Sequence, residues 1–255
     1  MHRAIAIAVL AAAFCAGAPA VRAERLITSL SSHQVMIGSS FTGTELVLFG
    51  SVERDAATVP RRGGYDIVVS VLGPRETLVA RRKERVFGIW ANTQTQVFDQ
   101  APSYLAVLSN RALDAITSSD LQRRYEIGLA SVNLSKTATR EPHYEEFRAA
   151  LVALMSKRGL YRAETNAVTF LTPNLFRTSI VIPAEAAVGN YEVDVKLFAD
   201  GVMITRTTSA LEIVKVGIEQ FVANTARDHG LLYGLGVVGM ALATGWFASL
   251  VFRRD

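Results

Sequence analysis

The chain has 255 residues, half of them hydrophobic, and carries 27 Lys and Arg against 23 Asp and Glu. The cationic excess lies at the two ends, because residues 24–230 hold 23 cationic and 22 anionic side chains. This balance provides no general basic surface, so we expect no nucleic-acid partner. The only cysteine, Cys15, precedes that region, which is large enough to bury a core but can form no disulfide or cysteine metal site.

Residues 1–23 have the pattern of an export signal. His2 and Arg3 precede an apolar segment, and Val21-Arg22-Ala23 supplies the small residues that a signal peptidase recognises. We therefore predict that residues 1–23 are removed and that the chain from residue 24 onward folds outside the cytoplasm.

Residues 24–100 alternate between short apolar runs and turn residues. Tyr65, Ile67, Val69 and Val71, for example, alternate with Asp66 and Ser70, as in a strand with one buried face. No helix-length crossover separates these runs, so they are expected to pair in antiparallel fashion as the first part of a β-sandwich.

Residues 101–165 change to a helical period. The longest helix is expected from Pro142 to about Lys157, because apolar side chains recur along one face. These side chains are Tyr144, Phe147, Leu151 and Leu154. We interpret this region as a helical insertion that packs on the sheet.

Strand patterns return over residues 166–216. Tyr191 follows a tight loop and begins an alternating strand, which resembles the tyrosine corner of immunoglobulin-like domains. The predicted fold is therefore mainly β, an immunoglobulin-like antiparallel β-sandwich with a helical insertion. The pattern leaves open whether the strands form one sandwich or two small ones.

The C-terminal part is organised around an uncharged apolar run, residues 231–252, long enough to cross a bilayer as one helix. Arg253 and Arg254 begin the short tail, residues 253–255, and place it in the cytoplasm. Residues 217–230 precede the run. They fit either an amphipathic helix on the membrane surface or a helical extension of the span.

Small residues recur every four positions within this predicted membrane helix. Ala241, Gly245 and Ser249 would form one smooth face, which lets another transmembrane helix approach closely. Since small residues are common in membrane spans, the alternative is that this face has no specific partner.

No arrangement of residues indicates catalysis. The sequence has neither a G-x-S-x-G nor a Ser-x-x-Lys motif, and His33, His143 and His229 stand far apart without ligand spacing. We therefore expect no catalytic residue, no metal and no cofactor, and we predict that the protein is not an enzyme.

A cluster of cations precedes an aromatic residue in the middle of the first strand region. The cluster comprises Arg81, Arg82, Lys83, Arg85 and Trp90. Such a patch could bind an anion, a lipid headgroup or an acidic protein surface. The alternative is a solvated edge strand whose charges prevent aggregation, with Trp90 in the core.

Three stretches carry a resemblance to a known family: residues 41–50 (FTGTELVLFG), residues 81–92 (RRKERVFGIWAN) and the C-terminal span with its Arg-Arg-Asp ending. The chain resembles the putative transmembrane protein family of alphaproteobacteria over essentially its whole mature length. The resemblance implies an inner-membrane protein with one span and a periplasmic domain, and association with exporters of the sulfite-exporter type. It assigns no functional residue.

Two functions follow as hypotheses. The leading one is a non-enzymatic single-pass membrane protein whose periplasmic sandwich binds a membrane-protein partner, as an accessory subunit of a sulfite-exporter-type transporter. The second is a binding or sensing module for a small anion or an envelope lipid at the cationic cluster.

Overall fold

The computed structural model describes residues 24–54, 64–135, 143–217, 226–227 and 229–251. The predicted export signal, most of the segment 217–230 and the predicted tail 253–255 lie outside the described residues.

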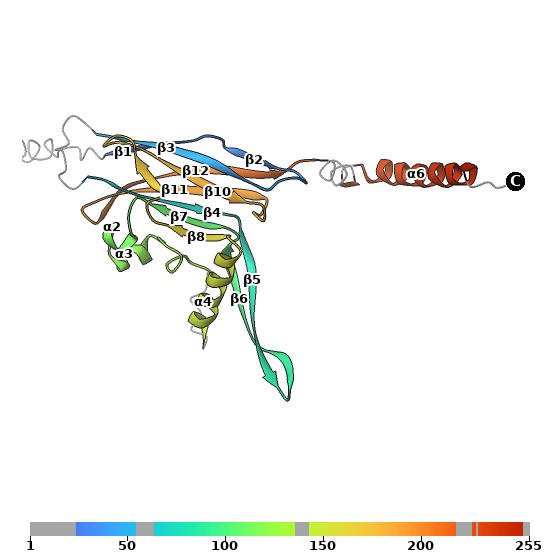
Figure 1. Cartoon of the computed structure of the whole chain (residues 1–255), viewed down its shortest axis with the longest axis horizontal. Coiled ribbons are helices and arrows are strands. Elements are labelled where there is room, and N and C mark those ends of the chain that lie inside the picture. The colour runs from blue at the N-terminus through green and yellow to red at the C-terminus, as the bar shows by residue number, and fades with distance from the viewer. Residues whose placement is uncertain (1–23, 55–63, 136–142, 218–225, 228, 252–255) are drawn as a thin grey trace, which may run out of the picture.

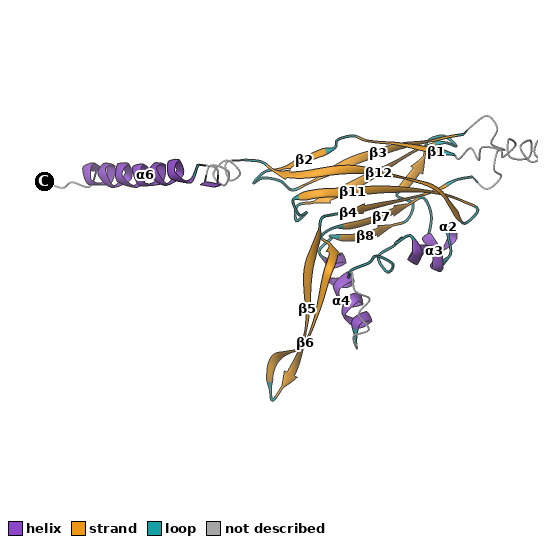
Figure 2. Cartoon of the chain, turned by 180° about the vertical axis from the view of Figure 1, so that it is seen from behind, coloured by secondary structure: helices purple, strands orange, loops and turns teal. Residues whose placement is uncertain are grey.

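Most of the described chain folds into two sheets that face each other, and a long hairpin leaves them at one side (Figures 1 and 2). The first sheet has the order β1 (Arg25–Leu30), β3 (Gly43–Glu53), β10 (Leu175–Pro183), β9 (Val168–Phe170). The second has the order β2 (Gln34–Ile37), β12 (Val202–Lys215), β11 (Gly189–Ala199), β4 (Asp66–Leu72), β7 (Leu105–Ser109), β8 (Tyr161–Glu164). The hairpin consists of β5 (Arg75–Val86) and β6 (Ile89–Pro102).

Alternating side chains of the two sheets fill the space between them. Leu48 and Phe176 of the first sheet are fully buried, as are Val69 and Val195 of the second. Because successive residues of a strand point to opposite faces, this alternation produces the period-two pattern seen in the sequence. The prediction of a mainly β, immunoglobulin-like sandwich is confirmed.

The strands form a single sandwich, because each sheet joins strands from both ends of the domain. In the first sheet β3 pairs with β10, and in the second β4 pairs with β11.

Two strand pairs, β2 with β12 and β7 with β8, are parallel, which differs from the expected antiparallel pairing throughout. The helical segment between β7 and β8 is long enough to act as a crossover, which lets the chain return in the same direction. Two strands therefore lie inside the range 101–165 that we predicted as helical.

The helical crossover contains α2 (Leu113–Ile116), α3 (Ser119–Arg124) and α4 (Tyr144–Lys157). These helices lie beside the six-stranded sheet, on the side away from the first sheet (Figures 1 and 2). Ile116 and Ile127 of this segment are buried, and so is Phe198 on the outer face of the sheet. The predicted helical insertion on the sheet is confirmed, and it adds a third layer.

The expected tyrosine corner is present. The hydroxyl of Tyr191 donates a hydrogen bond of 2.8 Å to the carbonyl of Ala187, four residues upstream. Burial raises the pKa of Tyr191 to about 12, so the hydroxyl stays protonated at neutral pH. The bond fixes the loop before β11 against the sheet.

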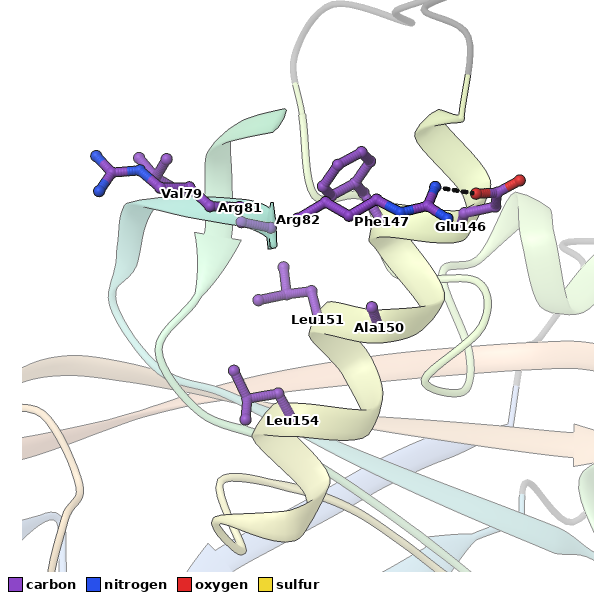
Figure 3. A pocket seen from close by; sticks show the side chains of 9 residues that line it. Val79, Arg81, Arg82, Glu146, Phe147, Ala150, Leu151 and Leu154 are labelled. Carbon is purple, nitrogen blue, oxygen red and sulfur yellow. Dashed lines mark hydrogen bonds and ion pairs between the residues drawn. The ribbon is translucent and has the colours of Figure 1, made fainter. Parts of the chain in front are cut away.

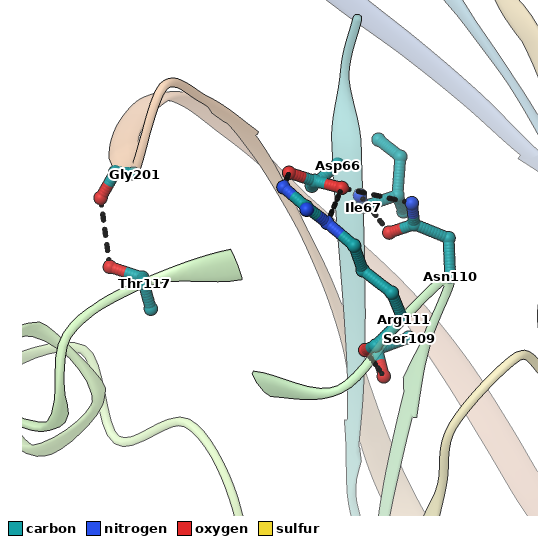
Figure 4. A network of polar contacts seen from close by, with 7 residues as sticks. All are labelled: Asp66, Ile67, Ser109, Asn110, Arg111, Thr117 and Gly201. Carbon is teal, nitrogen blue, oxygen red and sulfur yellow. Dashed lines mark hydrogen bonds and ion pairs between the residues drawn. The ribbon is translucent and has the colours of Figure 1, made fainter. Parts of the chain in front are cut away.

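A polar network joins the start of β4 to the start of the crossover (Figure 4). The buried carboxylate of Asp66 accepts hydrogen bonds from Arg111 Nε at 2.6 Å and Asn110 Nδ2 at 3.0 Å. Thr117 donates to the carbonyl of Gly201 at 2.9 Å, which ties the crossover to the turn between β11 and β12. These partners satisfy the buried carboxylate of Asp66, because they replace the water contacts that it loses on burial.

The last element is α6 (Gly230–Val251). Within it, Tyr233–Leu250 is long and apolar enough to cross a membrane, and none of that window is buried against the rest of the protein. An apolar helix that makes no contact with the described core has its natural environment in lipid.

Candidate functional site

The candidate site is built on an arm, which we define as the distal part of the β5–β6 hairpin, residues 81–96. At its base the hairpin is fixed to the sandwich. Phe98 is fully buried, and Arg75 Nη1 donates to the carbonyl of Gln100 at 3.1 Å. Beyond the base the two strands leave the sandwich and pair only with each other. Figures 1 and 2 show the arm projecting away from both sheets.

Helix α4 runs beside the base of the arm, and a groove of about 420 Å³ separates them (Figure 3). The floor of this groove is apolar and comes from both elements. It is formed by Val79 and Ala80 of β5 and by Phe147, Ala150, Leu151 and Leu154 of α4. Leu154 is 56 % exposed. One edge of the apolar face of α4, which we expected to pack on the sheet, therefore faces this open groove instead.

Opposite charges stand at the mouth of the groove. Arg82 Nη1 lies 3.3 Å from Glu146 Oε2 of α4, and Arg82 Nε lies 3.2 Å from Glu84 Oε1 on its own strand. Both carboxylate partners are about half exposed or more. Solvent screens such pairs strongly, so they contribute little to stability and remain available to another charged group.

Aromatic packing holds the start of α4 against the hairpin. The rings of Phe98 and Tyr144 lie 5.5 Å apart at an angle of 51°. Burial raises the pKa of Tyr144, which keeps its hydroxyl neutral. The groove therefore has one wall fixed by core contacts and another, the arm, that is free at its far end.

The five residues of the predicted cationic cluster all lie on this arm, and all are exposed. They do not converge on one point. Arg82 turns toward α4, whereas Arg81 points away from it (Figure 3). Arg85 Nε donates to the carbonyl of Gly88 at 3.2 Å. The arrangement is a band of charge along the arm rather than a compact site for one small anion.

Trp90 is 72 % exposed, so the alternative that placed it in the core is wrong. It lies across from Arg85 in the strand ladder, and the two side chains share one face of the hairpin. The hairpin is long enough to carry residues beyond the sandwich, which the sequence pattern did not indicate.

The residues of the predicted transmembrane contact lie in α6. Ala241, Gly245 and Ser249 are all exposed, and a side chain added at Gly245 would meet no atom within 4 Å. The face is thus unoccupied by any described part of the chain and is open to another helix.

A second cluster went unnoticed in the sequence. Ser70 is 2 % exposed, Asp194 6 % and Lys196 3 %, on the outer face of the six-stranded sheet. Lys196 Nζ forms an ion pair with Asp194 Oδ2, while Asp194 Oδ1 and Ser70 Oγ have no hydrogen-bond partner among the described residues. These side chains border a polar cleft of about 320 Å³ beside Tyr125. Charged and apolar residues alternate along β11, as in a strand with one solvated face, but here residues of the helical crossover lie over the charged face.

Metal ligands do not gather anywhere in the described ranges, where no three His, Cys, Asp or Glu side chains are placed to hold an ion.

Two solved structures resemble parts of this fold, with little sequence identity. The N-terminal domain of the Streptococcus gordonii adhesin Sgo0707 matches 74 % of this chain at 8 % identity and a TM-score of 0.29, and the chain spans 32 % of that structure. AggA, the major subunit of aggregative adherence fimbriae type I from Escherichia coli, matches 76 % of this chain and 97 % of its own at 10 % identity and a TM-score of 0.28. No curated protein is similar enough in sequence to match.

The sequence itself matches a family. Residues 25–254 fit the family described as "Putative transmembrane protein (Alph_Pro_TM)", which covers the sandwich, the crossover, the arm and α6 together. The match agrees with the single apolar helix and with the resemblance in the sequence, and it identifies the protein as a membrane protein. The chain belongs to the Alph_Pro_TM family.

Proposed function

We propose that this protein is a non-catalytic, single-pass inner-membrane protein whose periplasmic β-sandwich binds a partner membrane protein through the groove between β5 and α4. The observation that carries the proposal is the groove itself, with its apolar floor and with Arg82 and Glu146 at its mouth. The partner class is the one that the family resemblance implies, a transporter of the sulfite-exporter type, for which this chain would serve as an accessory subunit.

A protein partner fits the groove better than a small ligand does. The polar groups stand at the mouth and do not converge inside, as they would in a small-molecule site. The apolar surface also continues beyond the groove, because Val97, the cross-strand neighbour of the groove residue Val79, is about half exposed on β6. An extended apolar surface with a charged rim is typical of protein interfaces.

The orientation follows from charge. Arg253 and Arg254 follow the apolar helix directly, and cationic residues next to a span favour the cytoplasmic side. The sandwich then lies on the periplasmic side, where the predicted export signal would deliver it.

Crosslinking tests the groove directly. We expect a photoreactive p-benzoylphenylalanine at Leu154, in the full chain and in its own membranes, to form an adduct with a polytopic membrane protein. The matched control is the same residue at Met36, which is 64 % exposed on β2 and lies outside the groove. Adducts at neither position, or equal adducts at both, would reject the groove as the interface.

The membrane helix provides a second test of partner binding. Gly245→Leu should reduce co-purification of the same polytopic protein, because the larger side chain separates the two helices. Gly236→Leu makes the same change about 180° around the helix, away from the small-residue face, and should have no effect. Equal recovery of the partner with both variants would show that the face at Gly245 makes no contact.

A further inference from the structure

The turn at the tip of the arm has an unusual residue for its geometry. Phe87 has φ +49° and Gly88 has φ +88°, the pair of left-handed conformations that a two-residue hairpin turn of type I′ requires. Glycine adopts this conformation freely and asparagine does so at small cost, whereas a bulky side chain is disfavoured there. Phe87 is also fully exposed, so no contact within the described protein compensates. A strained, uncovered aromatic residue indicates a contact outside the chain.

The residues next to this turn extend the apolar tip over both faces of the hairpin. Ile89 is 70 % and Trp90 72 % exposed. Val86 pairs across from Ile89, and Arg85 pairs across from Trp90, so the two large side chains of β6 point to opposite sides. A flat protein surface would cover one face of such a wedge and leave the other in water. A lipid leaflet that surrounds the tip would cover both faces.

The charges of the arm stand behind this apolar tip. Residues 81–96 carry four cations and one carboxylate, a net charge of +3, and all four cations precede Phe87. At about 3.4 Å per residue, Lys83 and Arg85 lie roughly 7–14 Å behind Phe87 along the strand. Arg85 therefore lies within the roughly 5–10 Å to which interfacial segments bury their apolar side chains, level with the lipid phosphates, and Lys83 lies just beyond it. Trp is itself enriched at this depth.

A bilayer is within reach of the tip. The chain belongs to a transmembrane family, and 14 residues separate the last strand, ending at Lys215, from α6 at Gly230. Those residues can span at most about 50 Å when extended, which allows the sandwich to approach the membrane surface. Because α6 already holds the domain there, even a weak lipid affinity acts at a high effective concentration.

We propose that the tip of the arm, Val86 to Trp90, inserts into the leaflet that faces the sandwich and that Lys83 and Arg85 contact the phosphates of anionic lipids around it. The tip is a second membrane contact besides α6, and it fixes the tilt of the sandwich over the bilayer. This inference is independent of the partner proposed for the groove.

The native tryptophans make the test direct. In a Trp246→Phe variant Trp90 is the only tryptophan, so its emission reports the tip alone. We expect the full chain, reconstituted in vesicles of phosphatidylcholine and phosphatidylglycerol, to show blue-shifted Trp90 emission that brominated acyl chains quench. Replacing Lys83 and Arg85 by Gln should weaken insertion about fivefold for each charge removed, and only when phosphatidylglycerol is present.

Two variants serve as controls. Phe87→Asn keeps a residue that suits the turn, so the arm should fold as before while quenching by the brominated lipid is lost. A tryptophan placed at Met36 on β2, with Trp90 and Trp246 replaced by Phe, should remain accessible to aqueous iodide and should ignore the bromine.

Two outcomes overturn the proposal. If Trp90 stays red-shifted and open to iodide in the vesicles, the tip lies in water. If its emission is blue-shifted but brominated lipid does not quench it, the tip is covered by protein, such as a second copy of the chain. Since these vesicles contain no transporter, neither result depends on whether the groove binds a partner.

Discussion

Lys196→Met should lower the free energy of unfolding by about 3–5 kcal/mol, the cost of leaving one member of a buried ion pair without its partner. The reason is the environment of Asp194, whose side chain is only 9 % exposed and whose Oδ2 is held by Lys196. Its second oxygen, Oδ1, already lacks a hydrogen-bond partner in the described structure. Without the ammonium group, the carboxylate loses its ion-pair partner in a site that water solvates poorly. Urea unfolding of the full chain in detergent, followed by the circular dichroism of the sheets, measures the loss.

The chain contains a matched control for this pair. Arg162 and Glu164 also stand two residues apart on one strand, β8, at 2.6 Å, but their side chains are 34 % and 42 % exposed. Arg162→Met should therefore cost less than about 1 kcal/mol. Replacing both buried partners, as Asp194→Leu with Lys196→Met, should recover most of the lost stability, because no unpaired charge remains. A loss for Lys196→Met as small as that for Arg162→Met would mean that water reaches the buried pair.

Gly50→Ala should be the most damaging single-methyl change in the sandwich, lowering the free energy of unfolding by about 3 kcal/mol. A Cβ at this position would lie 2.2 Å from Cζ of Phe176, which is directly opposite in the β3–β10 ladder and fully buried. The centroid of the Phe176 ring lies 5.9 Å from that of the Phe170 ring, so the Phe176 ring cannot move aside without disturbing the core. The same urea transition reports the change.

A double-mutant cycle identifies the cause of this loss. Phe176→Ala alone should cost about 3–5 kcal/mol, because it removes a buried ring. In that background Gly50→Ala should cost almost nothing, since the atom it would strike is gone. Gly38→Ala is the control: its Cβ would be no closer than 3.8 Å to any atom, and the change should be neutral. An equal cost of Gly50→Ala in both backgrounds would show that strain in β3 itself, rather than the clash with the ring, causes the loss.

The site was only partly predictable, and the arm shows why. The sequence singled out residues 81–85 and Trp90 because cations next to an aromatic residue are unusual, and every one of them lies on the arm. It did not show that the strands carrying them leave the sandwich, since local strand propensity is the same within a sheet and in a free hairpin. Phe87 carried a signal that could have been used: a turn of the form Phe-Gly between two strand patterns, where Asn-Gly is usual.

The groove depended on tertiary contacts in the same way. The apolar stripe of the helix now seen as α4 was recognised from its spacing, but its orientation was not. Met155 faces the core and is 3 % exposed, whereas Leu154 is 56 % exposed beside β5. Periodicity gives the width of an apolar face, and what packs against each part of it depends on the neighbouring elements. The hairpin that forms the other wall lies more than 50 residues away in sequence, and no local pattern links it to α4.

The sequence by itself determined the features that local periodicity and composition encode. These are the alternating strands, the tyrosine corner at Tyr191, the helical segment and the apolar membrane helix, since each depends on neighbours within a few residues. Only the tertiary structure decided which of the outward faces meets water. Asp194 and Lys196 alternate as exposed residues do, yet they are buried, because the crossover between two parallel strands folds back over them. Trp90 and Phe87 have the composition of a core, yet they are exposed, because the hairpin is longer than the sheet that supports it. Burial depends on contacts between distant segments, and one-dimensional patterns do not contain them.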